Sequence, residues 1–310
     1  MISLTCHHGL ETGRGAGRDA LQPGQVALLV IHDLRTGSQQ VVLETKELIE
    51  APNWTRDGAR LVVNGGGRLL SIAADGSGVL TPIEVGAVRG INNDHVISPD
   101  GTTIYFSAEG HLYAVGIEGG QARRISNTHP EDQPYTSWLH GVSPDGQQVA
   151  YVSVEPWGED VFGARNLATI PAAGGAQTQL TTGPNAYDGP EYHPDGGWLY
   201  YNSEEASQVA GHAQLFRMRL DTGEREQLTD DDRVNWFPHL SPDGSQLVYL
   251  SYPSGTVSHP ADLPVELRLL EAQGGQPRTL VRLFGGQGTM NVNSWSPDGT
   301  RFAFVAYPAA

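Results

Sequence analysis

The chain has 310 residues, with 39 glycines and 20 prolines spread along its length, and a formal net charge of −16 from 35 acidic and 19 basic residues. This composition favours many short strands and tight turns over long helices. The negative surface argues against a nucleic-acid partner, and a single cysteine, Cys6, excludes an internal disulfide framework.

The N-terminal stretch MISLTCHHGLETGRG has no basic region followed by an apolar run, so no signal peptide is expected. No segment approaches the roughly 20 apolar residues of a membrane helix. We therefore expect a cytoplasmic protein without a membrane partner, or a periplasmic one if an N-terminal segment has been removed. Residues 1–24 are predicted to be a flexible tail, and residues 25–310 a single domain.

Six turn tetrads punctuate this domain at intervals of 43 to 55 residues: TRDG (55–58), SPDG (98–101), SPDG (143–146), HPDG (193–196), SPDG (241–244) and SPDG (296–299). Proline presets φ for a type I turn, aspartate accepts local backbone hydrogen bonds, and glycine takes the left-handed position. The tetrad aspartates are thus predicted to be turn residues. A strand pattern such as TIYFSA or WLYYNS follows each tetrad.

Repeats of about 40–50 residues with four strands each are the size of propeller blades. The intervals between the tetrads supply five blades. The sixth is predicted to combine the C-terminal strand, TRFAFVAY, with the N-terminal strands QVALLVIHDL and SQQVVLETK. The expected fold is an all-β, six-bladed β-propeller in which residues 300–307 pair with residues near 25–34 and remove the exposed sheet edges.

The segments WSPDGTRFAFVA, LFRMRLDTGEREQLT and SPDGSQLVYLSY resemble the PD40/WD40-like propeller repeat of the TolB family, and the resemblance covers residues 25–310. TolB itself is periplasmic and carries an additional N-terminal α/β domain that contacts partners. This chain shows no such domain, so the resemblance implies the propeller and not the cell-envelope role.

Polar residues precede the tetrads in five blades, where the innermost strands begin and the central channel opens. We expect them to converge at the channel mouth and to form a site for a polar ligand. His259 and Gln287 are expected to lean over this mouth. Three long polar segments, 155–166, 203–213 and 252–264, are predicted to be loops on the same face.

Specific roles follow from side-chain chemistry. As catalytic residues we predict His95, His140 and Asp188, since imidazoles and carboxylates exchange protons near neutral pH. The predicted substrate-binding residues are Asn93, Asp94, Trp138, Asn235, Trp236, His259, Gln287, Asn291 and Asn293. The alternative is a purely structural role, in which the channel histidines hydrogen-bond between blades and hold them in register.

His95, His140 and His239 are also candidate ligands for Mn²⁺ or Zn²⁺. All three precede a tetrad, but each comes from a different blade, and no local motif such as HExxH is present. The architecture is similar to that of oligogalacturonate lyases, whose channel histidines hold a divalent cation. Those ligands do not align residue by residue with this chain.

Two functions remain open. The first is binding of a small polar molecule or oligosaccharide, with carbohydrate lyase or hydrolase activity as its enzymatic form. The second is a non-enzymatic protein-interaction scaffold, which would carry an exposed apolar patch for a protein partner. The clustering of polar residues at the channel favours the first.

Overall fold

Each tetrad forms the hairpin that joins the first two strands of a sheet. The computed structural model describes residues 18–130, 135–157 and 160–309. In the second tetrad, the Ser98 hydroxyl donates to Asp100 (2.6 Å) and accepts from the Thr103 backbone N–H (2.9 Å). Gly101 takes a φ of 76°. The same serine–aspartate hydrogen bond recurs at Ser143, Ser241 and Ser296, which identifies these aspartates as turn residues.

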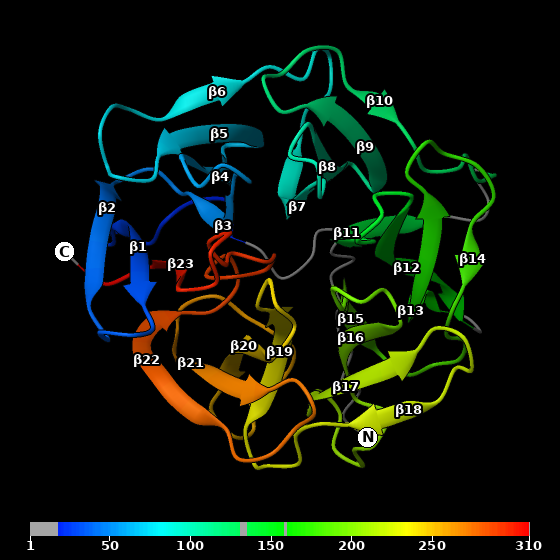
Figure 1. Cartoon of the computed structure of the whole chain (residues 1–310). Helices are drawn as coiled ribbons and strands as arrows, with labels where there is room; N and C mark the ends of the chain where they lie inside the picture. Colours follow the sequence, from blue (N-terminus) through cyan, green and yellow to red (C-terminus); the bar gives the residue numbers. More distant parts are fainter. Residues whose placement is uncertain (1–17, 131–134, 158–159, 310) are drawn as a thin grey trace, which may run out of the picture.

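The resulting sheets stand as six blades around a central channel (Figure 1). Blade 1 contains β3 (Glu50–Trp54), β4 (Arg60–Gly65), β5 (Arg68–Ala73) and β6 (Thr81–Ile83). Blade 2 contains β7 (Ile91–Ile97), β8 (Thr103–Ala108), β9 (His111–Gly116) and β10 (Arg123–Arg124). Blade 3 contains β11 (Thr136–Val142), β12 (Gln148–Trp157), β13 (Asp160–Pro171) and β14 (Thr178–Gln179).

Blade 4 contains β15 (Tyr187–Tyr192), β16 (Trp198–Ser203), β17 (Gln214–Arg219) and β18 (Arg225–Gln227). Blade 5 contains β19 (Val234–Leu240), β20 (Gln246–Tyr252), β21 (Leu263–Glu271) and β22 (Arg278–Gly285). Among the described residues there is no helix long and apolar enough to cross a membrane. The expectation of an all-β propeller is confirmed.

Blade 6 closes the ring with strands from both ends of the chain, as predicted. Its order is β2 (Gln39–Thr45), β1 (Ala27–Asp33) and β23 (Arg301–Ala306), with β1 and β23 antiparallel from Leu28↔Ala306 to Asp33↔Arg301. In place of a regular innermost strand, this blade has an irregular segment, residues 286–295, that makes a single bridge, Trp295↔Phe302. This irregular segment carries the side-chain amides of Gln287 and Asn291, which bond to each other, and Gln287 also bonds to Asn93 of blade 2.

A β-bulge interrupts the innermost strand of each of the five complete blades. In β11 the pairing shifts between Leu139 and Gly141, so His140 is the extra residue. The shifts in β3, β15 and β19 occupy the equivalent place. In β7 the shift lies one residue further from the tetrad, and His95 pairs regularly with Phe106. A bulge redirects the side chains beside it, so His95 and His140 point differently although both lie three residues before a tetrad.

One predicted loop is different in the structure. Residues 155–166 were expected to form a long loop, but most of them extend the β12–β13 hairpin, with Glu155 paired with Ala164 and Trp157 with Asp160. The alternation of apolar and polar residues needed for a strand is weak in EPWGEDVFGARN, and pairing with the partner strand outweighs it. Residues 204–213 and 253–262 are loops, as expected.

The ring is held by apolar side chains between neighbouring blades. One buried cluster joins Trp236 and Val248 of blade 5 to Phe302 and Phe304 of blade 6. Side chains of adjacent sheets thus share one packed layer, and each blade depends on its neighbours for burial.

Closure of the ring can be tested at Phe304, which is 1% exposed. Truncation by F304A should lower the free energy of unfolding by about 3–5 kcal/mol, because it removes a buried aromatic ring and leaves a cavity. The exposed Val41 in the neighbouring strand is the control, and V41A should change stability by less than about 0.5 kcal/mol. Urea unfolding followed by tryptophan fluorescence measures both. Equal small effects would contradict closure through β23.

Candidate functional site

The bulge in β11 brings His140 against two carboxylates. Its Nε2 lies 3.0 Å from Oδ1 of Asp188 in β15 and 3.9 Å from Oδ1 of Asp94 in β7. Its Nδ1 donates to the Asn291 carbonyl oxygen at 3.3 Å. Because both ring nitrogens face acceptors, the imidazole is held as a doubly protonated cation. Residues from four blades therefore meet at this side chain.

Asp188 is fixed by its own backbone neighbourhood. Its Oδ1 accepts the Gly189 backbone N–H at 2.7 Å. Gly189 has a φ of 60°, and a Cβ there would lie 3.0 Å from the Asn202 side-chain oxygen and 3.1 Å from the Phe237 ring. Glycine is thus required for the carboxylate to reach His140. Phe237 in turn stacks on His140, with ring centroids 5.7 Å apart.

The irregular segment of blade 6 adds a chain of amides. Gln287 Oε1 accepts from His259 Nδ1 (2.7 Å) and from Asn291 Nδ2 (2.9 Å). Its Nε2 donates to Asn93 Oδ1 at 3.4 Å. His259 Nε2 lies 3.9 Å from Oδ2 of Asp188. The structure therefore brings together seven of the residues predicted from the sequence: Asn93, Asp94, His140, Asp188, His259, Gln287 and Asn291.

Glu50 of β3 joins this cluster, although the sequence interpretation passed over it. It is 6% exposed, and its Oε2 accepts from Asn64 Nδ2 at 3.2 Å. Its Oε1 is buried without a hydrogen-bond partner among the described residues. Glu50 stands five residues before its tetrad, the same offset as Asn93 and Asp188. Aligning the six tetrads at that offset would have revealed it.

Burial and charge set the protonation of the cluster. Burial raises the pKa of Glu50 to about 7 and that of Asp94 to about 6. Burial opposes a charged His140, but the carboxylates of Asp94 and Asp188 outweigh it and raise the pKa of the imidazole. Burial would raise the pKa of Asp188, yet hydrogen bonding and attraction from His140 lower it. At neutral pH the site thus holds one ion pair beside two carboxyls that titrate near pH 6–7.

Three predicted residues hold blades together instead. His95 Nε2 lies 3.4 Å from the Val62 carbonyl oxygen of blade 1, and burial lowers the pKa of His95 to about 4. His239 Nδ1 contacts Glu191 Oε2 at 2.8 Å, and its Nε2 lies 3.2 Å from the Met290 carbonyl oxygen. Asn293 donates to Glu191 Oε1 and to the Leu240 carbonyl oxygen.

The remaining predicted residues lie at the periphery. Asn235 donates to Gln214 and Asp231 and accepts from Ser251, all within blades 4 and 5. Trp236 is buried against His259, with ring centroids 4.3 Å apart. Trp138 is half-buried in β11. Trp236 therefore borders the cluster, while Asn235 is part of a separate structural network.

The predicted metal set is not assembled in this structure. The ring nitrogens of His95 and His239 face acceptors in separate inter-blade networks, and only His140 reaches the cluster. Within residues 18–130, 135–157 and 160–309, no group of three or more His, Cys, Asp or Glu side chains is arranged to hold a metal ion. These residues do not fit a Mn²⁺ or Zn²⁺ site built on His95, His140 and His239.

A loop closes over the cluster. The residues of the cluster are all less than a tenth exposed, and His259 at 9% is the most accessible of them. The loop that carries His259, residues 253–262, is tied down by Arg18, whose guanidinium bonds Asp262 (2.8 Å) and the Gln287 carbonyl oxygen (3.1 Å). Arg18 lies in the predicted tail, but its side chain is 5% exposed and its guanidinium stacks 3.7 Å from the Tyr307 ring centroid.

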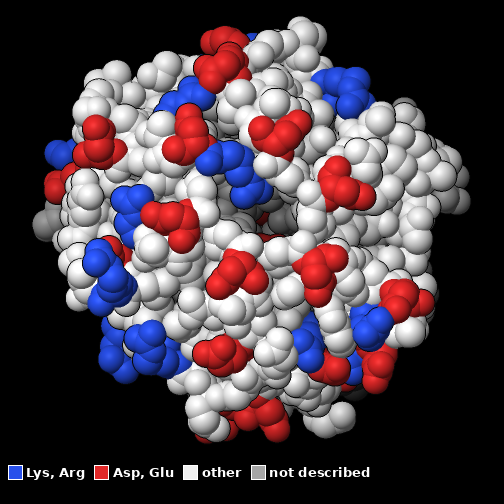
Figure 2. Space-filling model, in the orientation of Figure 1, with Lys and Arg blue, Asp and Glu red and all other residues white. Residues whose placement is uncertain are grey.

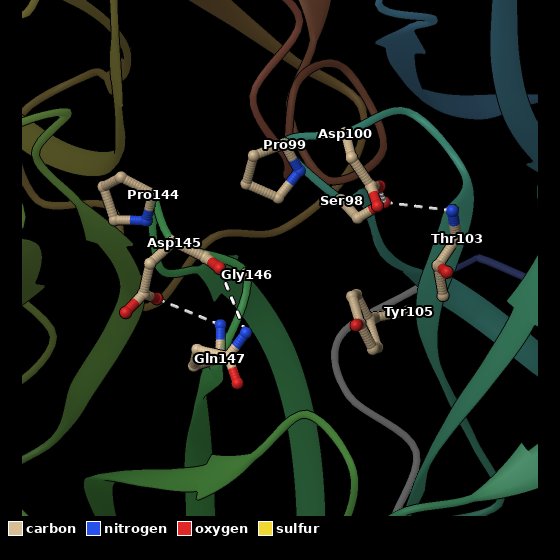
Figure 3. A pocket seen from close by; sticks show the side chains of 9 residues that line it. All are labelled: Ser98, Pro99, Asp100, Thr103, Tyr105, Pro144, Asp145, Gly146 and Gln147. Carbon is tan, nitrogen blue, oxygen red and sulfur yellow. Dashed lines mark hydrogen bonds between the residues drawn. The ribbon is translucent and has the colours of Figure 1, made fainter.

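Two surface hollows lie at the other ends of the innermost strands, beside the tetrads. One, of about 390 Å³, is bordered by the turns of blades 2 and 3, including Asp100, Tyr105 and Asp145 (Figure 3). The other, of about 450 Å³, lies between blades 3 and 4. The aspartates at these hollows hold their own turns through Oδ1. The candidate site is the buried cluster.

Comparisons with known proteins place this chain among β-propellers that resemble TolB. Residues 141–263 match the family model described as the TolB beta propeller domain. An uncharacterized protein of Agrobacterium fabrum is 37% identical over 99% of both chains. A solved structure provisionally named TolB, from Agrobacterium tumefaciens, is 36% identical with a TM-score of 0.82, covering 92% of this chain and 99% of that one.

A more distant structural neighbour shares the fold alone. An oligogalacturonate lyase in complex with manganese is 16% identical, with a TM-score of 0.56, and the match covers 88% of this chain and 70% of that one. The metal belongs to that lyase. The channel cluster of this chain consists of carboxyl groups, side-chain amides and the His140 imidazole.

Glu191 is a second residue missed by the sequence interpretation, and it lies two residues before its tetrad, as His239 does. It accepts from the Leu240 backbone N–H (2.7 Å), from Asn293 and from His239. E191A should therefore destabilise the protein by about 3–5 kcal/mol, because it leaves buried donors unpaired. E44A, at an exposed position in β2, should change stability by less than about 0.5 kcal/mol. Chemical denaturation decides; similar values for the two variants would refute a bracing role.

Glu50 predicts a pH-dependent stability. Its raised folded-state pKa, about 7 against 4.5, means that its contribution is fully present below pH 4.5 and is lost as the pH rises through 7. The stability of E50Q relative to wild type should thus increase between pH 4.5 and 7.5, by up to about 3 kcal/mol, and then level off. E44Q should show no such trend. Thermal unfolding across pH measures the difference, and a constant E50Q offset would contradict the burial argument.

Proposed function

Because this chain belongs to the TolB-like β-propeller family, we propose that it binds a polar, hydroxyl-rich ligand of the oligosaccharide class at its channel cluster. The observation that carries the proposal is the buried His140–Asp188 ion pair, surrounded by side-chain amides from other blades. Carboxylates and amides accept and donate the hydrogen bonds that sugar hydroxyls need. A purely structural ring would be served by apolar side chains at lower cost.

The charge of the cluster favours an uncharged sugar over an acidic one. Asp94 and Asp188 share one imidazolium, and the third carboxyl group, Glu50, lies beside Asp94. The chain as a whole carries a net charge of −16, and on the face seen in Figure 2 several acidic side chains and one basic group lie around the channel opening. An anionic uronate would meet repulsion from these carboxyl groups.

Catalysis would use the same groups. Asp94, with a pKa near 6, and His140 are the proton donors, and Asp188 orients the imidazole through its 3.0 Å contact. These roles suit hydrolysis of a glycosidic bond better than β-elimination from an acidic sugar, which needs a cation to neutralise the carboxylate. The loop over the cluster, residues 253–262, would have to move for the ligand to enter.

A scaffold function has weaker support. The large apolar side chains that are well exposed among the described residues, Val41, Val79, Val209, Val257 and Phe284, belong to different strands and loops. No one element gathers them into a docking face of the kind a stable protein partner requires.

The proposal predicts that Asp188 is essential for binding. In titration calorimetry against neutral gluco-, xylo- and malto-oligosaccharides, D188N should weaken the binding of the best ligand at least tenfold, because it removes a charged hydrogen-bond partner. D195N, in a tetrad turn on the other side of the ring, is the control and should bind like wild type. If a ligand is found, newly formed reducing ends report hydrolysis, and ultraviolet absorbance reports an unsaturated lyase product. Binding that survives D188N would overturn the proposed site.

A further inference from the structure

The carboxyl groups at the channel outnumber their positively charged partners. Asp188 is paired with His140 at 3.0 Å, and Asp94 reaches the same imidazole only at 3.9 Å. Glu50 has no cation in hydrogen-bond contact among the described residues, and its neighbour Asp94 adds repulsion. One imidazolium thus serves two of the three acids, and Glu50 is left without it.

Arg18 does not fill this role. Its charge acts on Glu50, but its Nη1 and Nη2 bond Asp262 and the Gln287 carbonyl oxygen, and its guanidinium plane stacks on Tyr307. The other charged or titratable groups acting on Glu50 or influenced by it are Asp94 and the Tyr307 phenol, neither of which brings positive charge. Arg18 is therefore committed elsewhere.

Apart from Asn64 and the side chain of Asn93, which also acts on it, the Glu50 carboxyl group lacks hydrogen-bond donors in the part of the chain that the structure describes. Glu50 Oε1 and Asn64 Oδ1 are both buried acceptors without a partner among the described residues, and the two side chains are joined through Asn64 Nδ2 and Glu50 Oε2. Rotating the Asn64 amide would turn its oxygen toward Glu50, which is unfavourable whenever Glu50 is ionised, as it mostly is at pH 7.5. Buried acceptors of this kind are normally satisfied, and an ammonium group supplies three donors with the missing charge.

The backbone beside Glu50 leaves no room for a side chain at position 288. A Cβ at Gly288 would lie 2.4 Å from Glu50 Oε1 and 2.6 Å from the Tyr307 hydroxyl, and Gly288 also has a φ of 89°. The Gly288 carbonyl oxygen accepts from the Ala51 N–H at 2.8 Å, which holds the two segments together. The approach of glycine to the carboxyl group keeps Glu50 in position without covering it by a side chain.

From this geometry we propose that Glu50 is the cation-recognising residue of the site, and that the ligand carries a primary ammonium group beside its hydroxyls. The inference rests on the proposed function and specifies it further: the ligand is an amino-substituted sugar or glycoside. Its ammonium donates to Glu50 and Asn64, while its hydroxyls engage the amides of Gln287 and Asn291. The acidic channel then attracts the ligand as well as holding it.

The test compares two glycosides of nearly equal shape, 2-aminoethyl glucoside and 2-hydroxyethyl glucoside, in titration calorimetry with the full chain at pH 7.5. Wild type should bind the ammonium form at least tenfold more tightly, because only it supplies charge to Glu50. E50Q keeps the size of the side chain and should reduce this ratio to near one. E44Q removes a carboxylate from exposed β2 and should leave the ratio unchanged.

Each outcome separates the two proposals. If both glucosides bind wild type equally, or if E50Q keeps the preference, the ammonium inference is wrong while sugar binding stands. If neither glucoside binds, the proposed sugar function loses its support, and methylammonium chloride becomes the probe of the inference. Thermal stabilisation of wild type, but not of E50Q, by methylammonium would then support the cation site. Equal stabilisation of both, or none, would overturn it.

Discussion

The position of one β-bulge in each innermost strand decides which side chains reach the channel. Backbone pairing fixes the tetrad end of each strand, and the extra residue a few positions earlier turns the chain so that alternate side chains no longer face the blade interior. Where the bulge admits His140, the imidazole meets carboxylates from two other blades. Where the bulge is displaced by one residue, His95 stays in the ladder and braces blade 1. Which side chains form the site therefore depends on the pairing register between the first and second strands of each blade.

This dependence explains what could be predicted from the sequence. The fold is encoded locally, because each tetrad contains the serine, aspartate and glycine that form its turn, and the strand patterns follow at a constant offset. Asp188 and Gln287 were also predicted, as polar residues at channel positions, but the same reasoning selected Asn235 and Asn293, which belong to structural networks. His95 and His140 were not distinguishable, since both precede a tetrad by three residues. Only the pairing with the second strand separates them.

Glu50 and Glu191 show the opposite failure. Each stands in a segment that reads as ordinary strand sequence, EAPNW and YDGPEYHP. Glu191 is satisfied by donors from blades 5 and 6, whereas Glu50 keeps one oxygen without a donor. Two carboxyl groups of similar burial therefore have different effects. Glu191 stiffens a blade interface, whereas Glu50 leaves the channel short of positive charge. Their hydrogen-bond partners, which lie far away in sequence, make the difference.

The sixth blade has a consequence for how the chain acquires its structure. Its strand β23 comes from the last ten residues, while β1 and β2 come from the first fifty. During synthesis on the ribosome, therefore, five blades can form as an open arc in which β1 pairs with β2 on one side and has no partner on the other until β23 has been synthesised. That edge can pair with the strand of another molecule during this interval. Crowded polysomes would be the place where this propeller is most exposed to exchange of its final strand between copies.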